Sequence, residues 1–410
     1  MNRFAFTLLY ILLTSSLYAQ EKTDPWLQDL LAAQASPLFK HVLNHKDSFQ
    51  YQVIYSQIER NRRNKPTFTH YYLNVNKDRY FNPASTVKLP VVLAALEKIN
   101  DLEVKGLNKY TPMLTDSGYT GQTRVTTDTS SQNGLPSVAH YAKKVFLVSD
   151  NDAYNRLYEF VGQQGLNETL WQKGYTHTRI TRRFVPMSPE ENRYTNPIRF
   201  VHKGRVVYQQ PFTYSKIDFD FSKPILIGNA HYNREDKLIN TPMDFTTHNN
   251  FPLQDLQQML QSVLFPKSVP KKQRFRLSKD DYRFLYQYMA MLPSQSQYPN
   301  YDTTEFFDSY TKFLYKNGKS KIPSHLRILN KTGWSYGFLT DASYVIDLEN
   351  KVEYMITAVI YVNRDGVLND NKYEYTEIGY PFFAELGRII YGHELARTRK
   401  YRPRFGDFGY

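Results

Sequence analysis

Ser85 and Lys88 stand three residues apart, a spacing that suits an oxygen nucleophile and its base. Apolar residues recur at helical spacing after them: Leu89, Val92, Leu93, Leu96 and Ile99. This pattern predicts a buried helix that begins close to Ser85. Residues three apart on a helix lie on one face with Cβ atoms about 5–6 Å apart, so a lysine with a depressed pKa can take the proton of the serine hydroxyl.

The same Ser-x-x-Lys spacing recurs later in the chain, next at Ser268 and Lys271. Chance gives roughly two copies in a chain of this composition, so the spacing alone is a weak signal. Pro266 and Pro270 surround the second copy, and no apolar helical pattern follows it. We therefore expect the second copy to have no catalytic role.

A second polar motif, Ser149-Asp150-Asn151, separates two stretches with helical apolar spacing, 138–148 and 153–161. The tripeptide is predicted to interrupt the helical run and to present the Ser149 and Asn151 side chains to a cleft. The alternative is a plain helix N-cap, a role that Asp150 or Asn151 fills well.

A third motif, Lys331-Thr332-Gly333, closes a predicted strand that begins at Arg327. A lysine and a hydroxyl at a strand edge form an anion site. A glycine at this position lets a ligand approach the backbone closely. The alternative is an ordinary strand end with a solvated lysine.

Strand patterns lie at both ends of the chain and helical patterns lie between them. Near the N-terminus, residues 52–58 and 68–75 predict a β-hairpin around the polar turn 60–66. The C-terminal part predicts three strands and an amphipathic helix: 327–331, 342–348, 352–361 and 382–395. Glu349-Asn350-Lys351 is the expected turn between the last two strands.

The expected parts are a signal peptide (1–19), an N-terminal lead (20–50), a sheet region (50–84 and 325–397), a helical region (85–324) and a basic tail (398–410). The sheet and helical regions form one domain over 50–397. Within the helical region, about 198–240 is interpreted as an insertion with short strands at 201–207 and 225–227. The basic run that begins at Arg397 is expected to be solvated.

Composition and the N-terminus limit the classes of function. The 410 residues include no cysteine, which excludes disulfide scaffolds, thiol nucleophiles, zinc ribbons and iron–sulfur clusters. Residues 1–19 have a basic start, an apolar run of about ten residues and an end at Ala19, which is the layout of a secretory signal peptide. We expect export to the periplasm or medium, with no transmembrane segment in the mature chain. The net charge of +13 then suits an anionic envelope or substrate rather than nucleic acid.

In this order and setting, the three motifs resemble the set shared by class A β-lactamases and penicillin-binding proteins, the serine penicillin-recognising enzymes. The resemblance covers most of residues 50–125, 135–182 and 325–397, and it leaves out 198–240. It implies an α/β (α+β) fold of the β-lactamase/transpeptidase type. In that fold an antiparallel sheet from both chain ends is flanked by helices and joined to a mainly helical region.

The resemblance also implies catalytic roles. Ser85 would attack an amide carbonyl to give an acyl-enzyme, with Lys88 as proton acceptor or relay. The backbone N–H groups of Ser85 and Trp334 would form the oxyanion hole. Ser149 would pass the proton to the leaving nitrogen.

Substrate binding is implied for four further positions. Asn151 would hold the substrate amide, and Lys331 and Thr332 would bind its carboxylate beside Gly333. The implied partner is a small β-lactam or a peptidoglycan stem peptide. No cofactor is expected, and no metal, because Arg397 stands where a zinc-protease helix starting at His393 needs its second histidine.

The deacylating group departs from the family pattern. Class A β-lactamases carry a catalytic glutamate after a Thr-Arg-Leu-Asp-Arg-like run, and in this chain that position holds Phe184. Glu190 or Glu191 would fill the role if the loop were longer. The alternative is that both are solvated carboxylates in a proline-bounded loop.

Three functions follow from these observations. The main hypothesis is an exported monomeric serine hydrolase that acts on cyclic amides and hydrolyses β-lactams. The alternative is a penicillin-binding D-Ala-D-Ala peptidase or a specialised envelope hydrolase without efficient deacylation. A third, from another class, is a non-catalytic envelope-binding module that retains the fold.

Overall fold

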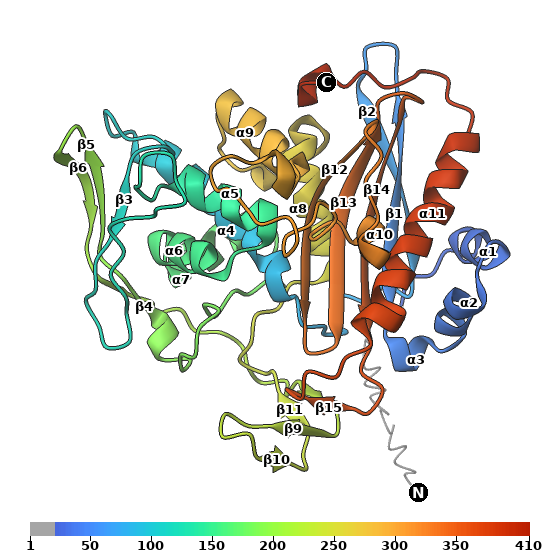
Figure 1. The fold of residues 1–410 in the computed structure, drawn as a ribbon, viewed down its shortest axis with the longest axis horizontal. Helices are drawn as coiled ribbons and strands as arrows, with labels where there is room; N and C mark the ends of the chain where they lie inside the picture. The colour runs from blue at the N-terminus through green and yellow to red at the C-terminus, as the bar shows by residue number, and fades with distance from the viewer. Residues whose placement is uncertain (1–20) are drawn as a thin grey trace, which may run out of the picture.

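The computed structural model describes residues 21–410, and its centre is a five-stranded antiparallel sheet with the order β12-β13-β14-β1-β2 (Figure 1). The strands come from both ends of the chain: β1 (Gln52–Arg60), β2 (Pro66–Leu73), β12 (Leu326–Ser335), β13 (Phe338–Asp347) and β14 (Val352–Tyr361). In the pairing that joins the two ends, Tyr55 lies opposite Ile356. The predicted α/β class, with an antiparallel sheet made by both chain ends, is confirmed.

The predicted signal peptide, residues 1–19, lies outside the described residues. Within residues 21–410, none of the helices has the length and apolar character needed to cross a membrane. Export therefore stays a prediction from the sequence.

Helices cover both faces of the sheet, so β13 and β14 are buried at every position. On one face lies α11 (Tyr380–Ala396), the helix predicted over 382–395, with α10 (Phe313–Lys316) beside it. The other face packs against the helical region. This region contains α4 (Lys88–Leu102), α5 (Val138–Val148), α6 (Asn151–Val161), α7 (Gln163–Gln172), α8 (Leu253–Leu264) and α9 (Lys279–Ala290).

The N-terminal lead is a packed part of the fold. It forms α1 (Pro25–Ala33), α2 (Pro37–Asn44) and α3 (Lys46–Phe49) beside α11 (Figure 1). Leu27 and Phe39 are buried in the same core as α11. Ser36 caps α2, and its backbone N–H donates to Glu385 Oε1 of α11 at 2.6 Å. Apolar contact between helices therefore orders a segment that the polar sequence pattern left undefined.

The predicted insertion contains the expected short strands. The hairpin β5 (Ile198–His202) and β6 (Arg205–Gln210) turns at Lys203 and Gly204, both with positive φ. Further strands are β8 (Leu226–Ile227), β9 (Ala230–Tyr232), β10 (Leu238–Ile239) and β11 (Met243–Asp244). A three-stranded sheet, β10-β9-β15, joins this part to β15 (Val367–Leu368), which follows β14 in the chain (Figure 1).

The prediction that the basic C-terminal run is solvated holds for Lys400, Arg402 and Arg404, which are exposed, and is wrong for Arg397 and Arg399. Arg397 forms an ion pair with Glu394 at 2.9 Å and a second with Glu59, and Arg399 also pairs with Glu394. The Glu394 side chain is fully buried, so it needs these cations to balance its charge. Beyond the run, Phe405 and Phe408 are buried in the core.

Candidate active site

Ser85 lies in a 3-10 turn, Ala84–Val87, that leads directly into α4. The turn is held on both sides of the serine. Asn82 Oδ1 accepts from the Ala84 N–H at 2.8 Å, and the Pro83 carbonyl accepts from Thr86 Oγ1 at 2.6 Å. Ser85 is partly exposed and lines a cavity, which leaves its hydroxyl open to a substrate.

Gly333 on β12 lies against this turn at a separation that only glycine allows. A Cβ atom on Gly333 would lie 2.6 Å from Ser85 N and 2.8 Å from Thr86 N. From the sequence we expected a ligand to approach the backbone closely at Gly333. In the structure the backbone of the nucleophile turn occupies that place, so the glycine sets the distance between Ser85 and strand β12.

Lys88 is fully buried beneath the cavity, one turn of helix from Ser85. Its Nζ donates to Asn151 Oδ1 at 2.6 Å and to the backbone carbonyl of Ser149, and Ser149 Oγ lies 3.5 Å away. Burial holds the pKa of Lys88 well below its ordinary value, and the nearby charge of Lys331 adds to this effect. The lowered pKa favours the neutral amine, which is the form that can accept a proton.

The second motif forms the junction between α5 and α6. Ser149 ends α5 in the left-handed conformation, with φ of 61°. Asp150 is the N-cap of α6, and its carboxylate accepts from the Ala153 N–H at 2.8 Å. Both interpretations of the motif therefore hold at different residues, because the capping by Asp150 leaves Ser149 and Asn151 directed to Lys88 and the cavity.

The third motif lies on β12 at the edge of the sheet. Lys331 Nζ donates to Ser149 Oγ at 2.8 Å and to the Thr332 carbonyl at 2.7 Å. Thr332 Oγ1 is buried and has no hydrogen-bond partner within residues 21–410. Lys88, Lys331 and Thr332 lie beneath the cavity lining rather than in it.

Burial lowers the pKa of Lys331 to about 7, and two neighbours that the sequence analysis missed act on it in opposite directions. Asp341 raises this pKa and Lys312 lowers it. Lys312 Nζ donates to Asn330 Oδ1 at 2.7 Å, and Asn330 Nδ2 donates to Asp341 Oδ1 at 2.9 Å. The signal available in the sequence was Asp341, an acidic residue within an apolar strand pattern. In the structure, every position of this strand, β13, is buried.

Phe184 stands next to Lys88, at the place where the family resemblance predicts a glutamate. Lys88 Nζ lies 5.2 Å from the centre of the Phe184 ring, which stacks on Tyr154 at 4.7 Å. The Phe184 N–H donates to Asn155 Oδ1 at 2.8 Å, which fixes the backbone at this point. The position beside the base is therefore filled by an apolar ring.

The structure does not bring Glu190 or Glu191 to the cavity, which corrects their proposed role in water activation. The Glu190 side chain is 56% exposed and lies 3.7 Å from Arg193. The Glu191 carboxylate accepts from the Ser188 N–H at 2.7 Å, within its own loop. This hydrogen bond lowers the pKa of Glu191, so the carboxylate is ionised and already satisfied.

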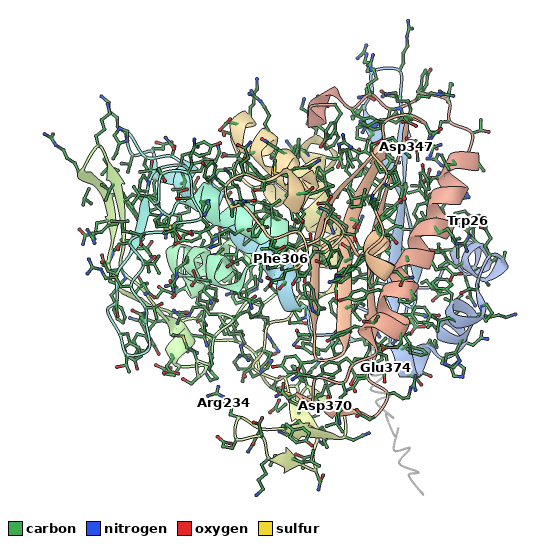
Figure 2. All side chains as sticks on the ribbon, in the orientation of Figure 1. Trp26, Arg234, Phe306, Asp347, Asp370 and Glu374 are labelled. Carbon is green, nitrogen blue, oxygen red and sulfur yellow. The ribbon has the colours of Figure 1, made fainter. Side chains whose placement is uncertain are left out.

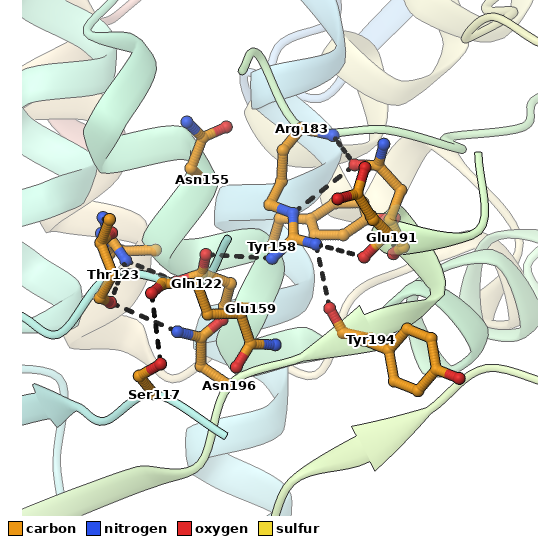
Figure 3. Close-up of polar contacts among 12 residues, drawn as sticks. Ser117, Gln122, Thr123, Asn155, Tyr158, Glu159, Arg183, Glu191, Tyr194 and Asn196 are labelled. Carbon is orange, nitrogen blue, oxygen red and sulfur yellow. Dashed lines mark hydrogen bonds and ion pairs between the residues drawn. The ribbon is translucent and has the colours of Figure 1, made fainter. Parts of the chain in front are cut away.

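Arg183 fixes the loop that carries both glutamates (Figure 3). Its buried guanidinium lies 3.2 Å from Glu159 Oε1 of α6 and donates to the backbone carbonyls of Glu191 at 2.8 Å and Tyr194 at 2.9 Å. The Arg183 N–H donates to Asn192 Oδ1 at 2.8 Å. The loop is thus tied to α6 through its backbone, which keeps the carboxylate of Glu191 away from Ser85.

We expect Glu190→Gln and Glu191→Gln to leave both the acylation of Ser85 and the lifetime of the acyl-enzyme unchanged within about twofold. Substitutions on exposed groups without buried partners have small effects. The measurement is the decay of a penicillin adduct by intact mass after removal of free penicillin. A lifetime extended tenfold or more in either variant would restore that glutamate as the deacylating base.

Ser85, Ser149 and Asn151 line a cavity of about 910 Å³ together with Phe184 and Trp334. Another part of the lining comes from the region around the insertion: His231, Tyr232, Asn233, Arg234, Met243 and Asp244. The sequence analysis left the insertion without a role, because its short strands carry no motif. In the folded chain it forms a side of the active-site cavity.

Comparison with known proteins supports the resemblance drawn from the motifs. Residues 39–213, a little under half of the chain, match the model of the beta-lactamase enzyme family, which confirms that resemblance. No curated protein matches the sequence.

Similar solved structures include a protein named PBP-A, with 15% identity over 89% of this chain and 97% of that one, at a TM-score of 0.47. A β-lactamase from Xanthomonas campestris pv. campestris has 13% identity over 89% of this chain and 98% of that one, at a TM-score of 0.47. A β-lactamase from Sphaerobacter thermophilus has 12% identity over 91% of this chain and 99% of that one, at a TM-score of 0.45.

Proposed function

We propose that this chain, whose residues 39–213 match the beta-lactamase enzyme family, is a serine hydrolase that forms an acyl-enzyme at Ser85 and releases the acyl group slowly. Its substrates are β-lactams and peptide-type amides that carry a carboxylate. The observation that carries the proposal is the buried Lys88, held by the second motif one helical turn from Ser85.

Acylation begins with attack of Ser85 Oγ on the carbonyl carbon, while the hydroxyl proton moves to the neutral amine of Lys88. When the C–N bond breaks, the nitrogen needs a proton. Ser149 Oγ accepts a hydrogen bond from Lys331, so its own hydrogen remains to be donated to that nitrogen. Lys88, 3.5 Å from Ser149 Oγ, then returns the proton to the serine.

The oxyanion donors are the N–H groups of Ser85 and Trp334 in this proposal. In a strand, the N–H and C=O of one residue point to the same edge, and the edge alternates with each residue. The Thr332 carbonyl accepts from Lys331 Nζ at the free edge of β12. Trp334 lies two residues further on, so its backbone groups point to the same free edge. Its N–H is thereby directed toward the turn that holds Ser85.

The remaining residues of the motifs are assigned to bind the polar groups of the substrate. Asn151 Oδ1 accepts from Lys88, so its Nδ2 is the group that binds the substrate amide carbonyl. Lys331 and Thr332 lie beneath the cavity floor, and we assign to them the positive charge and the free hydroxyl that favour the substrate carboxylate.

Slow deacylation is favoured by the ring of Phe184 beside Lys88. Hydrolysis of the ester needs a base that activates water, and a positioned base contributes about 10²–10⁴-fold. Asp244 is the only carboxylate of the cavity lining within residues 21–410, and it already accepts from the Thr246 N–H at 2.7 Å. This favours the penicillin-binding peptidase or specialised hydrolase over an efficient β-lactamase.

The test is the intact mass of the purified protein after mixing with benzylpenicillin. We expect an increase equal to the whole penicillin that persists after free penicillin is removed, and no increase in Ser85→Ala. Rapid turnover with no persistent adduct would instead support the β-lactamase hypothesis. No reaction at all would support the non-catalytic binding module, and an adduct on Ser85→Ala would refute the nucleophile.

Phe184→Glu is expected to shorten the lifetime of the acyl-enzyme by about 10-fold or more, because it places a carboxylate base at the position beside Lys88. Phe184→Leu is the matched control, since it removes the aromatic ring without adding a base. The decay of the benzylpenicillin adduct measures both. Equal lifetimes in the glutamate and leucine variants would show that the missing carboxylate does not limit deacylation.

Acylation by a carboxylate-bearing β-lactam is expected to slow as the pH rises above about 7. Lys331, with its pKa lowered to about 7 by burial, is protonated below that pH and loses its charge above it. The second-order acylation rate reports the free enzyme and so follows this titration. A matched β-lactam ester lacks the carboxylate and should show no decline. Lys331→Arg should move the decline beyond pH 9, since guanidinium keeps its charge.

Export to the periplasm is part of the same proposal. It is supported by the layout of residues 1–19 and by a substrate class found in the cell envelope. Cell fractionation, with N-terminal sequencing of the product, should find a mature chain that begins at Gln20. A cytosolic chain that keeps its first 19 residues would contradict it.

A further inference from the structure

The insertion is anchored firmly enough to act as a fixed wall of the cavity. Its strand β9 pairs in parallel with β15. Gly228 packs so closely on the Gly366 carbonyl that a Cβ atom on Gly228 would lie 2.6 Å from it. Asn369, itself in the cavity lining, donates to the Tyr232 carbonyl at 3.1 Å. Tyr232 and the turn after it are thus held by the segment that follows β14.

Two arginines line this side of the cavity without an acidic partner. Neither Arg182 nor Arg234 forms an ion pair within 4.0 Å among residues 21–410, and the acidic residue that Arg234 influences is Glu191, which lies outside the cavity lining and whose pKa Arg234 helps to lower. Arg234 is in the exposed turn between β9 and β10, where Figure 2 labels it below the helical region. Asp244 is the single acidic residue of the described lining, and its carboxylate accepts from the Thr246 N–H at 2.7 Å. This part of the cavity therefore carries a net positive charge.

Arg182 is positioned for ligand contact by its neighbours. Its Nη1 donates to His248 Nε2 at 2.9 Å, and its N–H donates to Asn249 Oδ1 at 3.1 Å. Burial and the charge of Arg182 lower the pKa of His248 to about 4, so His248 is neutral at pH 7 and acts as an acceptor. A guanidinium has five N–H donors, and one of them is used in this contact.

The position of these arginines relative to Ser85 defines which part of a substrate they meet. Lys331 and Ser149 mark the side of the leaving nitrogen and its carboxylate. Phe184 and Arg182 line the same cavity together with residues of the insertion, and we assign them to the acyl side of the substrate. A volume of about 910 Å³ is at the upper end of the range for small-molecule sites, roughly 300–1,000 Å³. The cavity thus has room for an extended acyl group beyond the scissile amide.

We propose that Arg182 and Arg234 bind a second acidic group, located on the acyl side of an elongated substrate, and so select doubly anionic acyl donors. The inference rests on the proposed function, because it needs acylation of Ser85. The substrate class is then an amide with one carboxylate beside the leaving nitrogen and another at the far end of its acyl chain.

The experiment compares two cephalosporins that differ at one group. One is glutaryl-7-aminocephalosporanic acid, whose acyl chain ends in a carboxylate, and the other is the matched compound in which that carboxylate is a carboxamide. The readout is the second-order rate of Ser85 acylation by intact mass. We expect the carboxylate compound to react about tenfold faster at low salt, with the preference reduced at 0.5 M salt because ions screen the contact.

The variants separate the inference from its premise. Arg182→Gln and Arg234→Gln should each lower the rate for the carboxylate compound by several-fold and leave the rate for the carboxamide unchanged. Lys237→Gln is the matched control, an exposed cation of the same hairpin that is outside the cavity lining, and should keep the preference.

Each outcome has one meaning. Equal rates for the two compounds in the unmodified protein overturn the inference while the proposed function stands. A loss of rate for both compounds in an arginine variant overturns it as well, because it shows a structural role. Failure of benzylpenicillin and both cephalosporins to acylate Ser85 refutes the proposed function and the inference with it.

Discussion

Lys88→Met is expected to lower the rate of Ser85 acylation by about 10²–10⁴-fold, the contribution typical of a positioned general base. Methionine has a similar volume and fills the buried space, but it cannot take the serine proton. The polar side chains of the second motif are engaged elsewhere: Asn151 accepts from Lys88, and Ser149 accepts from Lys331. The measurement is the time course of benzylpenicillin addition by intact mass.

The second Ser-x-x-Lys copy supplies the matched control for this experiment. Ser268 and Lys271 lie in 3-10 turns near the surface, and Ser268 Oγ donates to the Phe265 carbonyl at 2.8 Å. Lys271→Met should therefore acylate at the unmodified rate. An unchanged rate in Lys88→Met, with Lys271→Met also unchanged, would remove Lys88 from the mechanism.

A pH series of stability gives Lys88→Met a second readout. The unfolded chain keeps this lysine protonated up to about pH 10.4, whereas the folded chain holds it neutral from a lower pH. The unfolded state thus binds more protons between these two pH values, so stability rises with pH across that window. The variant should show a smaller rise, measured as the change in urea midpoint with pH.

Gly333→Ala is expected to abolish acylation and to destabilise the fold by about 1–3 kcal/mol, the usual cost of overpacking. The new Cβ would lie 2.6 Å from Ser85 N and 2.7 Å from the Pro83 carbonyl, and neither backbone group can rotate away. Strand β12 and the nucleophile turn must separate. The oxyanion donors, one from each side, then no longer converge on the same oxygen.

Gly392→Ala on α11 is the matched control, because a Cβ there meets nothing within 4 Å. It should leave acylation unchanged and stabilise the helix by about 0.5–1 kcal/mol. Urea unfolding and penicillin addition measure the two effects. Normal acylation in Gly333→Ala would contradict the proposed position of the oxyanion hole.

The local structure at each motif could be predicted because it depends on short spacings. Ser85 and Lys88 are one helical turn apart, and Ser149 to Asn151 is a break between two strongly patterned helices. These relations are local, so composition and periodicity are enough to predict them. The sheet from both chain ends followed in the same way from the alternation in β1 and β2 and the apolar runs in β13 and β14.

The parts that could not be predicted depend on contacts between distant segments. Nothing in residues 231–234 indicates that they lie in the same cavity as Ser85, because the strands that place them have only two or three residues each. Arg397 was expected in solvent since a basic run is usually solvated, but the buried Glu394 draws it inward. The pairing of Lys312 with Asn330 and Asp341 likewise arises only where α10 meets the sheet.

The sheet shared by the two chain ends has a consequence for synthesis. Ser85 and Lys88 leave the ribosome early, but the strand that carries Gly333 and Trp334 appears only after about four fifths of the chain. Contacts across such a separation form late, after a large loss of chain entropy. A product that stops before β12, at residue 325 or earlier, has the nucleophile and its base without their counterpart. Penicillin labelling would therefore distinguish finished, folded molecules from prematurely ended ones.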